Sequence, residues 1–544
     1  MKRTIPTLLL TVFPAILFSQ VATADLDINH VRATILTHGD MFNNPNTQTS
    51  GYEFPKGSGK HCAYTTGLWV GGFEKNSNTL KVAAQTYRQT GNDYWSGPIT
   101  NNGSGIDSLT SLKWEKIWKI NKTDVDVFLI TSPHTVANTP QVILEWPAKG
   151  NPHCKDAFGN SLNVSEDMAP FIDMNGDGNY NALDGDYPLM KGDQMLWWIF
   201  NDACLHTETN SSALMIQVKA SAFAFECHPS YRNVTFYSFE IENFNTSGYD
   251  SLVAGIMADV DLGYAFDDYI GFDSLRSLAY VYNGDAYDNG PDGYGYNLTK
   301  HGYKMLQGSG NHPPLGNFCF YNNVNGPTGN PGTLSEYYGY LNSTWKDGLP
   351  YTKSWNGRDQ SMPVTTYMYS GDPCLAGSFS EKSFLNVPDD RRIILSTKPI
   401  DVAAGSQPLL FSFAILNTEN DTTCSLLKLQ TLSDSVSLLA DNNFNYPCSG
   451  ASTGVSESIE SVPGFRVYPN PTSNTLNIEF ITGNTNGKTT QFEIYNILGQ
   501  SQSLPFERNL NSIKIETNTL ADGLYYLIIE HQNKRVMTKF LKQN

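Results

Sequence analysis

Residues 232–242 read Arg-Asn-Val-Thr-Phe-Tyr-Ser-Phe-Glu-Ile-Glu. β-Branched and aromatic residues dominate this run. Such residues are enriched in strands because they suit a pleated surface that is buried at least in part. The segment therefore predicts a β-strand.

Further runs of the same kind occur along the chain, joined by polar, glycine-rich turns. They cover residues 79–85, 124–130, 141–146, 213–226, 252–257, 391–396 and 408–415. Leucine and valine recur at three- and four-residue spacing between residues 425 and 439, which predicts one helix packed on a sheet. Strands without intervening helical patterns favour antiparallel packing. We therefore expect a mainly all-β fold, an antiparallel β-sandwich body with few helices.

The chain carries many more acidic than basic residues. Its formal net charge is −17; the first 24 residues and residues 465–544 each contribute +2, which leaves −21 on residues 25–464. A surface this acidic repels nucleic-acid phosphates and anionic lipids, so we exclude nucleic acid as a partner. The same surface attracts cations.

Eight cysteines are scattered through the first 448 residues, and none lies in the last 96. An even number of cysteines in an exported chain favours disulfides, although the pairing cannot be read from the sequence. Buried unpaired thiols are the alternative. No cysteine pair has the spacing of a zinc site.

The N-terminus has the pattern of a secretory signal peptide. Lys2 and Arg3 precede an apolar run at residues 5–18, and Ala22-Thr-Ala24 offers small residues for cleavage. We predict a signal peptide at 1–24, with the mature chain starting near Asp25, or near Gln20 if the cut follows Ser19. No stretch is long and apolar enough to span a bilayer, so no transmembrane segment is expected in the mature protein.

The C-terminus carries three ordered motifs after a Gly/Ser-rich linker at 449–464. They read Val467-Tyr-Pro-Asn-Pro-Thr472, Phe492-Glu-Ile-Tyr-Asn-Ile-Leu-Gly-Gln500 and Asp522-Gly-Leu-Tyr-Tyr-Leu-Ile-Ile-Glu530. Residues 465–544 resemble the type A C-terminal sorting domain of the Bacteroidetes type IX secretion system. The resemblance implies a small β-sandwich that the translocon reads and that is then removed. It also implies a body at 25–448 that is linked to a surface glycolipid or released, as a cell-surface or secreted protein.

The body resembles a group of uncharacterised secreted Bacteroidetes proteins that end in the same sorting module. The resemblance lies in Gly67-Leu-Trp-Val-Gly-Gly72, Ala83-Ala-Gln-Thr-Tyr87, Asp184-Gly-Asp-Tyr-Pro188, Trp197-Trp198, Asn201-Asp202 and Asp267-Asp-Tyr-Ile-Gly271. That group implies export but names no reaction. A subdivision of the body near residues 150–190 is a further expectation.

Residues 173–184 fit a twelve-residue calcium loop. The candidate ligands are Asp173, Asn175, Asp177, Asn179, Asn181 and Asp184. Gly178 stands at position 6, where such a loop turns sharply. The order resembles a dockerin-type loop, but no second copy follows and Gly185-Asp-Tyr-Pro188 opposes an exit helix, so we predict a bound Ca²⁺ without cohesin binding. An ordinary Asn/Asp/Gly turn is the alternative.

A second group of acids follows at residues 259–273. Its members are Asp259, Asp261, Asp267, Asp268 and Asp273. Like charges this close repel one another unless a cation neutralises them, which favours a second metal site. Solvated loop acids and a catalytic carboxylate pair are the alternatives.

The many tryptophans permit a glycan-binding face, with core packing as the alternative. HExxH does not occur, and no pair of histidines has the spacing of a catalytic or metal-binding motif. We therefore predict a calcium-stabilised surface protein used for adhesion or for binding glycan or matrix, without an assigned enzymatic activity. The alternative is a secreted polysaccharide hydrolase that uses carboxylates of the 259–273 region.

Overall fold

The computed structural model describes residues 21–445 and 460–543, apart from residues 46, 88–90, 101–104, 307–310, 463–464, 481–490, 497–499, 510–511 and 532–533. The chain divides into two compact units, Met1–Cys448 and Ser449–Asn544. The predicted signal peptide, except for its last four residues, and most of the predicted linker lie outside the described residues.

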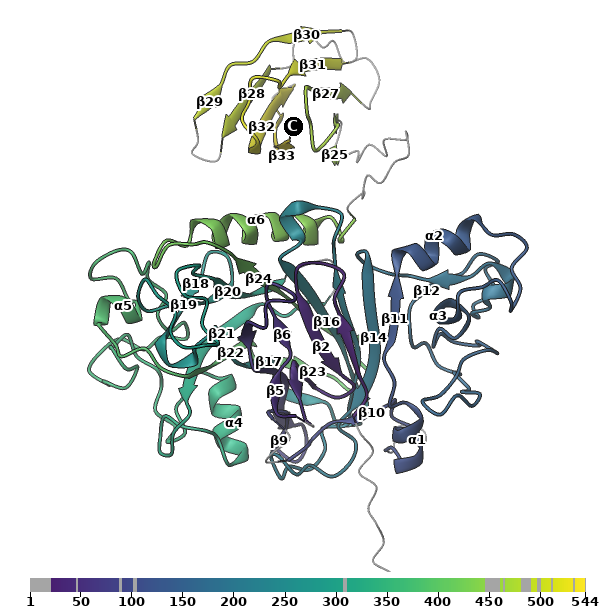
Figure 1. Ribbon diagram of the computed structural model, residues 1–544, viewed down its shortest axis with the longest axis vertical. Helices are drawn as coiled ribbons and strands as arrows, with labels where there is room; N and C mark the ends of the chain where they lie inside the picture. Colours follow the sequence, from purple (N-terminus) through teal and green to yellow (C-terminus); the bar gives the residue numbers. More distant parts are fainter. Residues whose placement is uncertain are drawn as a thin grey trace, which may run out of the picture. The chain divides into compact units, whose positions relative to one another are not determined.

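The first unit contains two large sheets whose strand pairs are antiparallel (Figure 1). The eleven-stranded sheet runs β21 (Leu315–Asn322), β22 (Arg391–Thr397), β17 (Tyr249–Asp259), β8 (Thr65–Glu74), β3 (Asp40–Met41), β2 (Arg32–Leu36), β6 (Tyr52–Glu53) and β7 (His61–Ala63), with β1 (Thr23–Leu26), β23 (Ile400–Val402) and β9 (Thr79–Ala84) on its branches. The nine-stranded sheet runs β10 (Trp95–Ser96), β14 (Gln194–Asn201), β15 (Ile216–Ala224), β16 (Val234–Asn243), β24 (Leu409–Thr418), β20 (Lys300–Leu306), β19 (Leu278–Asn283) and β18 (Asp268–Asp273), with β11 (Trp118–Asn121) paired to β14. The prediction of a mainly all-β antiparallel fold is confirmed.

The strand predicted from residues 232–242 is β16, in the middle of the nine-stranded sheet. Its residues Tyr237 and Phe239 point into the main core, where they join Trp69 and Ile256 of the eleven-stranded sheet. Because successive side chains of a strand point to opposite faces, the alternate residue Phe236 enters a second core on the outer face. The nine-stranded sheet is thus covered on both faces.

The predicted helix is also confirmed, as α6 (Leu427–Asp441). Its apolar stripe buries Leu429, Val436 and Leu439 against the outer face of the nine-stranded sheet. Figure 1 shows α6 lying across the body, in contact with β20 and β24. The helix closes one side of the second core.

Two of the predicted strands are wrong. Residues 124–130 belong to helix α2 (Lys122–Ile130), and residues 141–144 form helix α3 (Gln141–Leu144). The Asp124 carboxylate accepts a hydrogen bond from the backbone N–H of Asn121 at 2.9 Å, which caps the first turn of α2. Val125 and Phe128 then share one buried face, so the run that looked like a strand also has helical spacing.

Short elements complete the first unit. The helices are α1 (Ser108–Lys113), α4 (Leu334–Leu341), α5 (Glu381–Phe384), η1 (Ala182–Asp184), η2 (Pro229–Tyr231) and η3 (Ala265–Asp267), and the two-stranded pairs are β4 (Asn43–Asn44) with β5 (Thr49–Ser50) and β12 (Phe171–Ile172) with β13 (Tyr187–Pro188). Residues 150–190 are part of this unit. No helix in the described part of the chain is long and apolar enough to cross a membrane.

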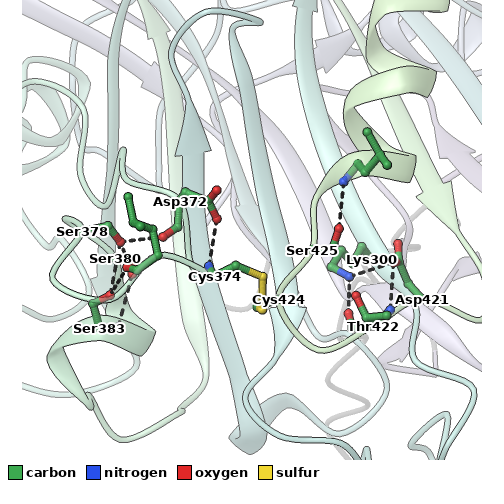
Figure 2. The surroundings of a disulfide bond; sticks show 12 residues. Lys300, Asp372, Cys374, Ser378, Ser380, Ser383, Asp421, Thr422, Cys424 and Ser425 are labelled. Atoms are coloured by element: carbon green, nitrogen blue, oxygen red, sulfur yellow. Dashed lines mark hydrogen bonds and ion pairs between the residues drawn. A yellow bond between two sulfur atoms is a disulfide. The ribbon is translucent and has the colours of Figure 1, made fainter.

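The expected disulfide is present between Cys374 and Cys424 (Figure 2). It joins the loop before α5 to the segment that leads into α6, across 50 residues of sequence. Beside it, the buried ammonium of Lys300 pairs with Asp421 at 3.2 Å. Cys227 is also disulfide-bonded. Among the described residues, four cysteines are free, of which Cys62, Cys154 and Cys319 are buried and Cys204 is exposed.

Replacing both Cys374 and Cys424 by serine is expected to lower the free energy of unfolding by about 2–4 kcal/mol, because the cross-link restricts the unfolded chain. Urea unfolding followed by tryptophan fluorescence measures this in the first unit alone, since all nine tryptophans lie between residues 69 and 355. Cys204→Ser is the matched control and should change stability by less than about 0.5 kcal/mol. Equal unfolding midpoints for the double variant and the control would contradict the prediction.

The second unit consists of two antiparallel sheets. One runs β25 (Glu460–Val462), β26 (Phe465–Tyr468), β27 (Thr475–Phe480), β31 (Ser512–Glu516) and β30 (Phe506–Arg508), and the other runs β29 (Ser501–Gln502), β28 (Gln491–Asn496), β32 (Gly523–His531) and β33 (Lys534–Lys542). Ile478 and Ile513 of the first sheet share one core with Ile494 and Leu527 of the second. The first and second sequence motifs begin within β26 and β28, and the third covers most of β32.

Candidate metal centres and a binding groove

The 173–184 loop begins with a tight turn around Asp173. The two oxygens of its carboxylate accept the backbone N–H groups of Gly176 at 2.7 Å and Gly178 at 2.9 Å. These bonds lower the pKa of Asp173, the bond from Gly178 most of all. Gly178 has a φ of 80°, which glycine adopts without strain. The sequence prediction of a sharp bend at this residue is confirmed.

The next predicted ligands repeat the same local bond. The Asn175 side-chain oxygen accepts the N–H of Asp177 at 3.0 Å, and the Asp177 carboxylate accepts the N–H of Asn179 at 2.7 Å. The oxygen atoms of alternate residues therefore fold back over the loop's own backbone. Bonds of this kind occur in Asn/Asp turns in general, and they leave the alternating oxygens on one short segment, as a calcium loop also has them.

The end of the loop is held by a residue that the sequence analysis did not single out. Asp186 is fully buried and accepts the N–H groups of Met174 at 2.8 Å and Asn181 at 2.9 Å, which ties the two sides of the loop together. Asn181 donates to the Asp184 carboxylate at 2.7 Å. In the sequence, this residue could have been found as an aspartate two positions after Asp184, the last predicted ligand of the loop.

A tighter acidic cluster consists of Asp259, Asp261 and Asp390. Each offers one carboxylate oxygen, and these oxygens lie within 4.8 Å of one another; the three aspartates of the 173–184 loop do not form such a group. Asp259 ends β17, where it pairs across the sheet with Arg392 of β22. Asp390 comes directly before β22, so strand pairing brings it to the other two from more than 120 residues away along the chain.

One guanidinium serves the acidic cluster. Arg392 binds the Asp259 carboxylate at 2.9 Å and also pairs with Asp390. The Tyr87 hydroxyl donates to the same oxygen of Asp259 at 2.7 Å. The other oxygen, Oδ1, is buried and has no hydrogen-bond partner in the described part of the chain. Three carboxylates thus face one cation from the protein.

The excess negative charge appears in the acidity of the cluster. Burial, followed by the charge of Asp261, raises the pKa of Asp259 well above its ordinary value. Burial, followed by the charge of Asp390, raises the pKa of Asp261 to about 6. Carboxylates in such surroundings are stabilised either by a proton or by a bound cation.

Asp267 and Asp268 lie in a neighbouring buried group. Asp268 is 1% exposed; one oxygen accepts the N–H of Leu262 at 3.0 Å, and the other has no partner among the described residues. One oxygen of Asp267 accepts the N–H of Asn289 at 2.9 Å. Burial, together with the charges of Asp267, Asp288 and Asp261, raises the pKa of Asp268.

Asp273 lies apart from the other predicted ligands. It stands at the far end of β18 and is paired with Arg276 at 3.1 Å, and it also accepts a hydrogen bond from Gln430 of α6 at 2.9 Å. The structure therefore brings Asp259 and Asp261 together with Asp390, not with Asp273. Asp390 is far from residues 259–273 in the sequence. Only the pairing of β22 with β17 shows that it joins this cluster.

A groove of about 600 Å³ lies on the outer face of the nine-stranded sheet. Its floor is formed by β14, β15, β16, β24 and β20, and its walls come from residues 167–171, from Leu189 and Lys191, and from the end of α6. The charged side chains along it are Lys149, Asp167, Lys191, Lys219 and Glu240. No carboxylate of the acidic cluster lines this groove.

The tryptophans do not form a glycan-stacking face. Trp69, Trp146, Trp198 and Trp345 are among the largest fully buried side chains. Trp355 is 59% exposed, Trp95 is partly exposed, and Trp197 lines the groove. Core packing therefore accounts for the tryptophan content better than an aromatic platform does.

The comparisons with known proteins agree with the C-terminal motifs. Residues 466–543 match the family described as the secretion system C-terminal sorting domain. Among curated proteins, none matches this chain. The sorting domain is the signal read by the type IX secretion machinery, so the chain is a secreted or cell-surface protein.

Proposed function

We propose that this protein is a calcium-stabilised surface or secreted protein that binds a glycan or matrix ligand and has no catalytic role. Calcium held by the 173–184 loop stiffens the first unit after export. The alternating Asp and Asn oxygens of that loop, turned around Gly178, are the observation that carries the proposal. Calcium prefers six to eight such oxygen ligands.

A second cation at the acidic cluster belongs to the same proposal. Asp259 presents a buried oxygen without a partner, and Asp261 and Asp390 present theirs close by. One arginine leaves the cluster with an excess of negative charge, and a divalent ion would neutralise it. The amended ligand set is Asp259, Asp261 and Asp390.

Chelation of calcium is expected to lower the melting temperature of the full-length protein. In the Asp173→Ala variant the decrease should be smaller, because the loop no longer binds calcium. At a calcium concentration ten times the Kd, one site adds about 1.4 kcal/mol of stability. Differential scanning calorimetry with calcium and with EDTA measures the difference. The control is Asp126→Ala, which removes an exposed aspartate of α2 that pairs with Lys122. Identical melting curves with and without chelator would refute calcium stabilisation.

The alternative function, a secreted polysaccharide hydrolase, has weaker support. Its proposed acids Asp259 and Asp268 are 2% and 1% exposed, and they are bound to Arg392 and to the backbone of Leu262. A glycoside hydrolase needs two carboxylates that reach the substrate. Polysaccharide turnover that Asp268→Asn abolishes would reverse this preference.

The export route includes removal of the predicted signal peptide. Thr23 and Ala24 pair with β2 as the first residues of β1. A cut after Ser19 leaves this strand whole, whereas a cut after Ala24 removes half of it. We therefore place the cleavage before Gln20, with N-terminal sequencing of the mature protein as the check. Attachment to a surface glycolipid after export belongs to the same proposal.

A further inference from the structure

The floor of the groove contains a row of serines that cross-strand pairing brings together. Ser221 of β15 pairs with Ser238 of β16, which pairs with Ser412 of β24. Trp197 and Leu306 flank the row on β14 and β20. Three small polar residues therefore sit side by side in the middle of a sheet whose adjacent rows carry large side chains.

The serines give the groove both its depth and its hydrogen-bonding groups. The hydroxyls of Ser238 and Ser412 are 3.0 Å apart and bond to each other. The Ser221 hydroxyl makes no hydrogen bond to any described residue, and its side chain is only half-buried. A hydroxyl-rich ligand seated on this row would find donors and acceptors along its length.

Three lysines and two acidic residues line the groove. Lys149 pairs with Asp167 at 3.4 Å, and Lys219 lies 2.7 Å from Glu242 and 3.8 Å from Glu240. Lys191 has no carboxylate within 4.0 Å in the described part of the chain. Its ammonium instead lies 5.3 Å from the centre of the Phe444 ring. Glu240 attracts this ammonium only from beyond 4.0 Å. Among the described residues, Lys191 is therefore the lysine of the groove without a direct ion pair, on a body whose overall charge is strongly negative.

We propose that the groove binds an acidic oligosaccharide. The serine row bonds the sugar hydroxyls, and Lys191 pairs with a carboxylate or sulfate group on the sugar. A volume of about 600 Å³ is within the range of pockets that hold small ligands. This inference rests on the proposed function and names the ligand class for it.

Other ligands fit the groove less well. A neutral sugar offers no negative group for a direct ion pair with the Lys191 ammonium. A peptide that adds a strand needs an open sheet edge, but β15, β16 and β24 are interior strands of their sheet. A chain of sugar residues that carries acidic groups can bond the serine hydroxyls and form a direct ion pair with Lys191.

Isothermal titration calorimetry of the full-length protein tests the proposal. The probes are a hexamer of galacturonic acid, the same hexamer with methyl-esterified carboxylates, and a sulfated oligosaccharide, all at one fixed free calcium concentration because hexuronates themselves bind calcium. We expect at least one acidic probe to bind, and the esterified hexamer to bind at least about 10-fold more weakly than the free acid if the hexuronate is the ligand. Whether the free acid or the sulfated probe binds identifies the anionic group.

Two variants and a control separate the groove from the rest of the surface. Lys191→Met is expected to weaken binding of the acidic probe about 10-fold, and Ser238→Leu, which fills the floor, about 100-fold. Lys122→Met, on α2 and outside the groove, should leave affinity unchanged. Melting curves confirm that each variant is folded.

The inference fails if neither acidic probe binds, or if Lys191→Met binds as tightly as the unaltered chain. The inference also fails if the esterified hexamer binds as tightly as the free acid and the sulfated probe does not bind. In that case the protein would still bind a glycan, as the proposed function states. Loss of the calcium effect on melting would instead count against the proposed function, without bearing on these titrations.

Discussion

Deletion of residues 465–544 is expected to abolish surface display and to leave the protein in the periplasm. These residues include the whole match to the sorting domain and form their own core. The deletion therefore removes the complete sorting signal as one folded unit. The main cores of the first unit contain none of these residues. The truncated protein should therefore fold but fail to reach the surface.

Surface proteolysis and cell fractionation in a bacterium with a type IX secretion system measure the result. The control is a fusion of residues 449–544 to an unrelated periplasmic protein, which should gain surface exposure. Tryptophan fluorescence of the truncated protein should match that of the full-length chain, since all tryptophans lie in the first unit. Normal display of the truncation would disprove the sorting assignment.

Arg392→Gln is expected to destabilise the first unit by about 3–5 kcal/mol in the absence of calcium, the range for breaking a buried ion pair from one side. Arg392 is 6% exposed, and it pairs with Asp259 and with Asp390. Its loss leaves buried carboxylates with no cation of the protein beside them. Urea unfolding in EDTA, followed by tryptophan fluorescence, measures the change.

Calcium should restore part of the stability lost in this variant, because an ion at the acidic cluster would supply the missing positive charge. The matched control is Arg358→Gln, which breaks an ion pair with Asp347 at 2.6 Å near the surface and should cost about 1 kcal/mol or less. A loss no larger than that of the control would mean that Arg392 does not compensate the cluster. If calcium raised the free energy of unfolding equally in the variant and in the unaltered chain, the ion would not be bound at the acidic cluster.

Local patterns were enough to predict several elements of the fold. The strand at 232–242 and the helix at 425–439 were predicted because burial of one face of a strand or helix requires apolar residues at regular spacing in the sequence. The bend at Gly178 was also local, since it depends on the backbone freedom of one residue. The sorting motifs are short and ordered, so they were legible without any tertiary information.

Residues 124–130 show where a local pattern is ambiguous. A short apolar run has both strand and helix spacing, and the Asp124 cap decided in favour of the helix. Placement of the tryptophans was equally undetermined, because a large aromatic ring suits a core and a sugar-binding surface alike. Burial of Trp69 and Trp198 between the sheets excluded the surface role for them.

Interactions between neighbours along the chain were enough to predict the strand-rich class, the C-terminal sorting signal and the order of oxygen donors in the 173–184 loop. Only the tertiary structure joined Asp390 to Asp259, excluded Asp273 and lined up Ser221, Ser238 and Ser412. These groupings depend on which strands pair and in what register. A shift of one residue turns every side chain of a strand to the opposite face, and no single stretch of sequence records that choice.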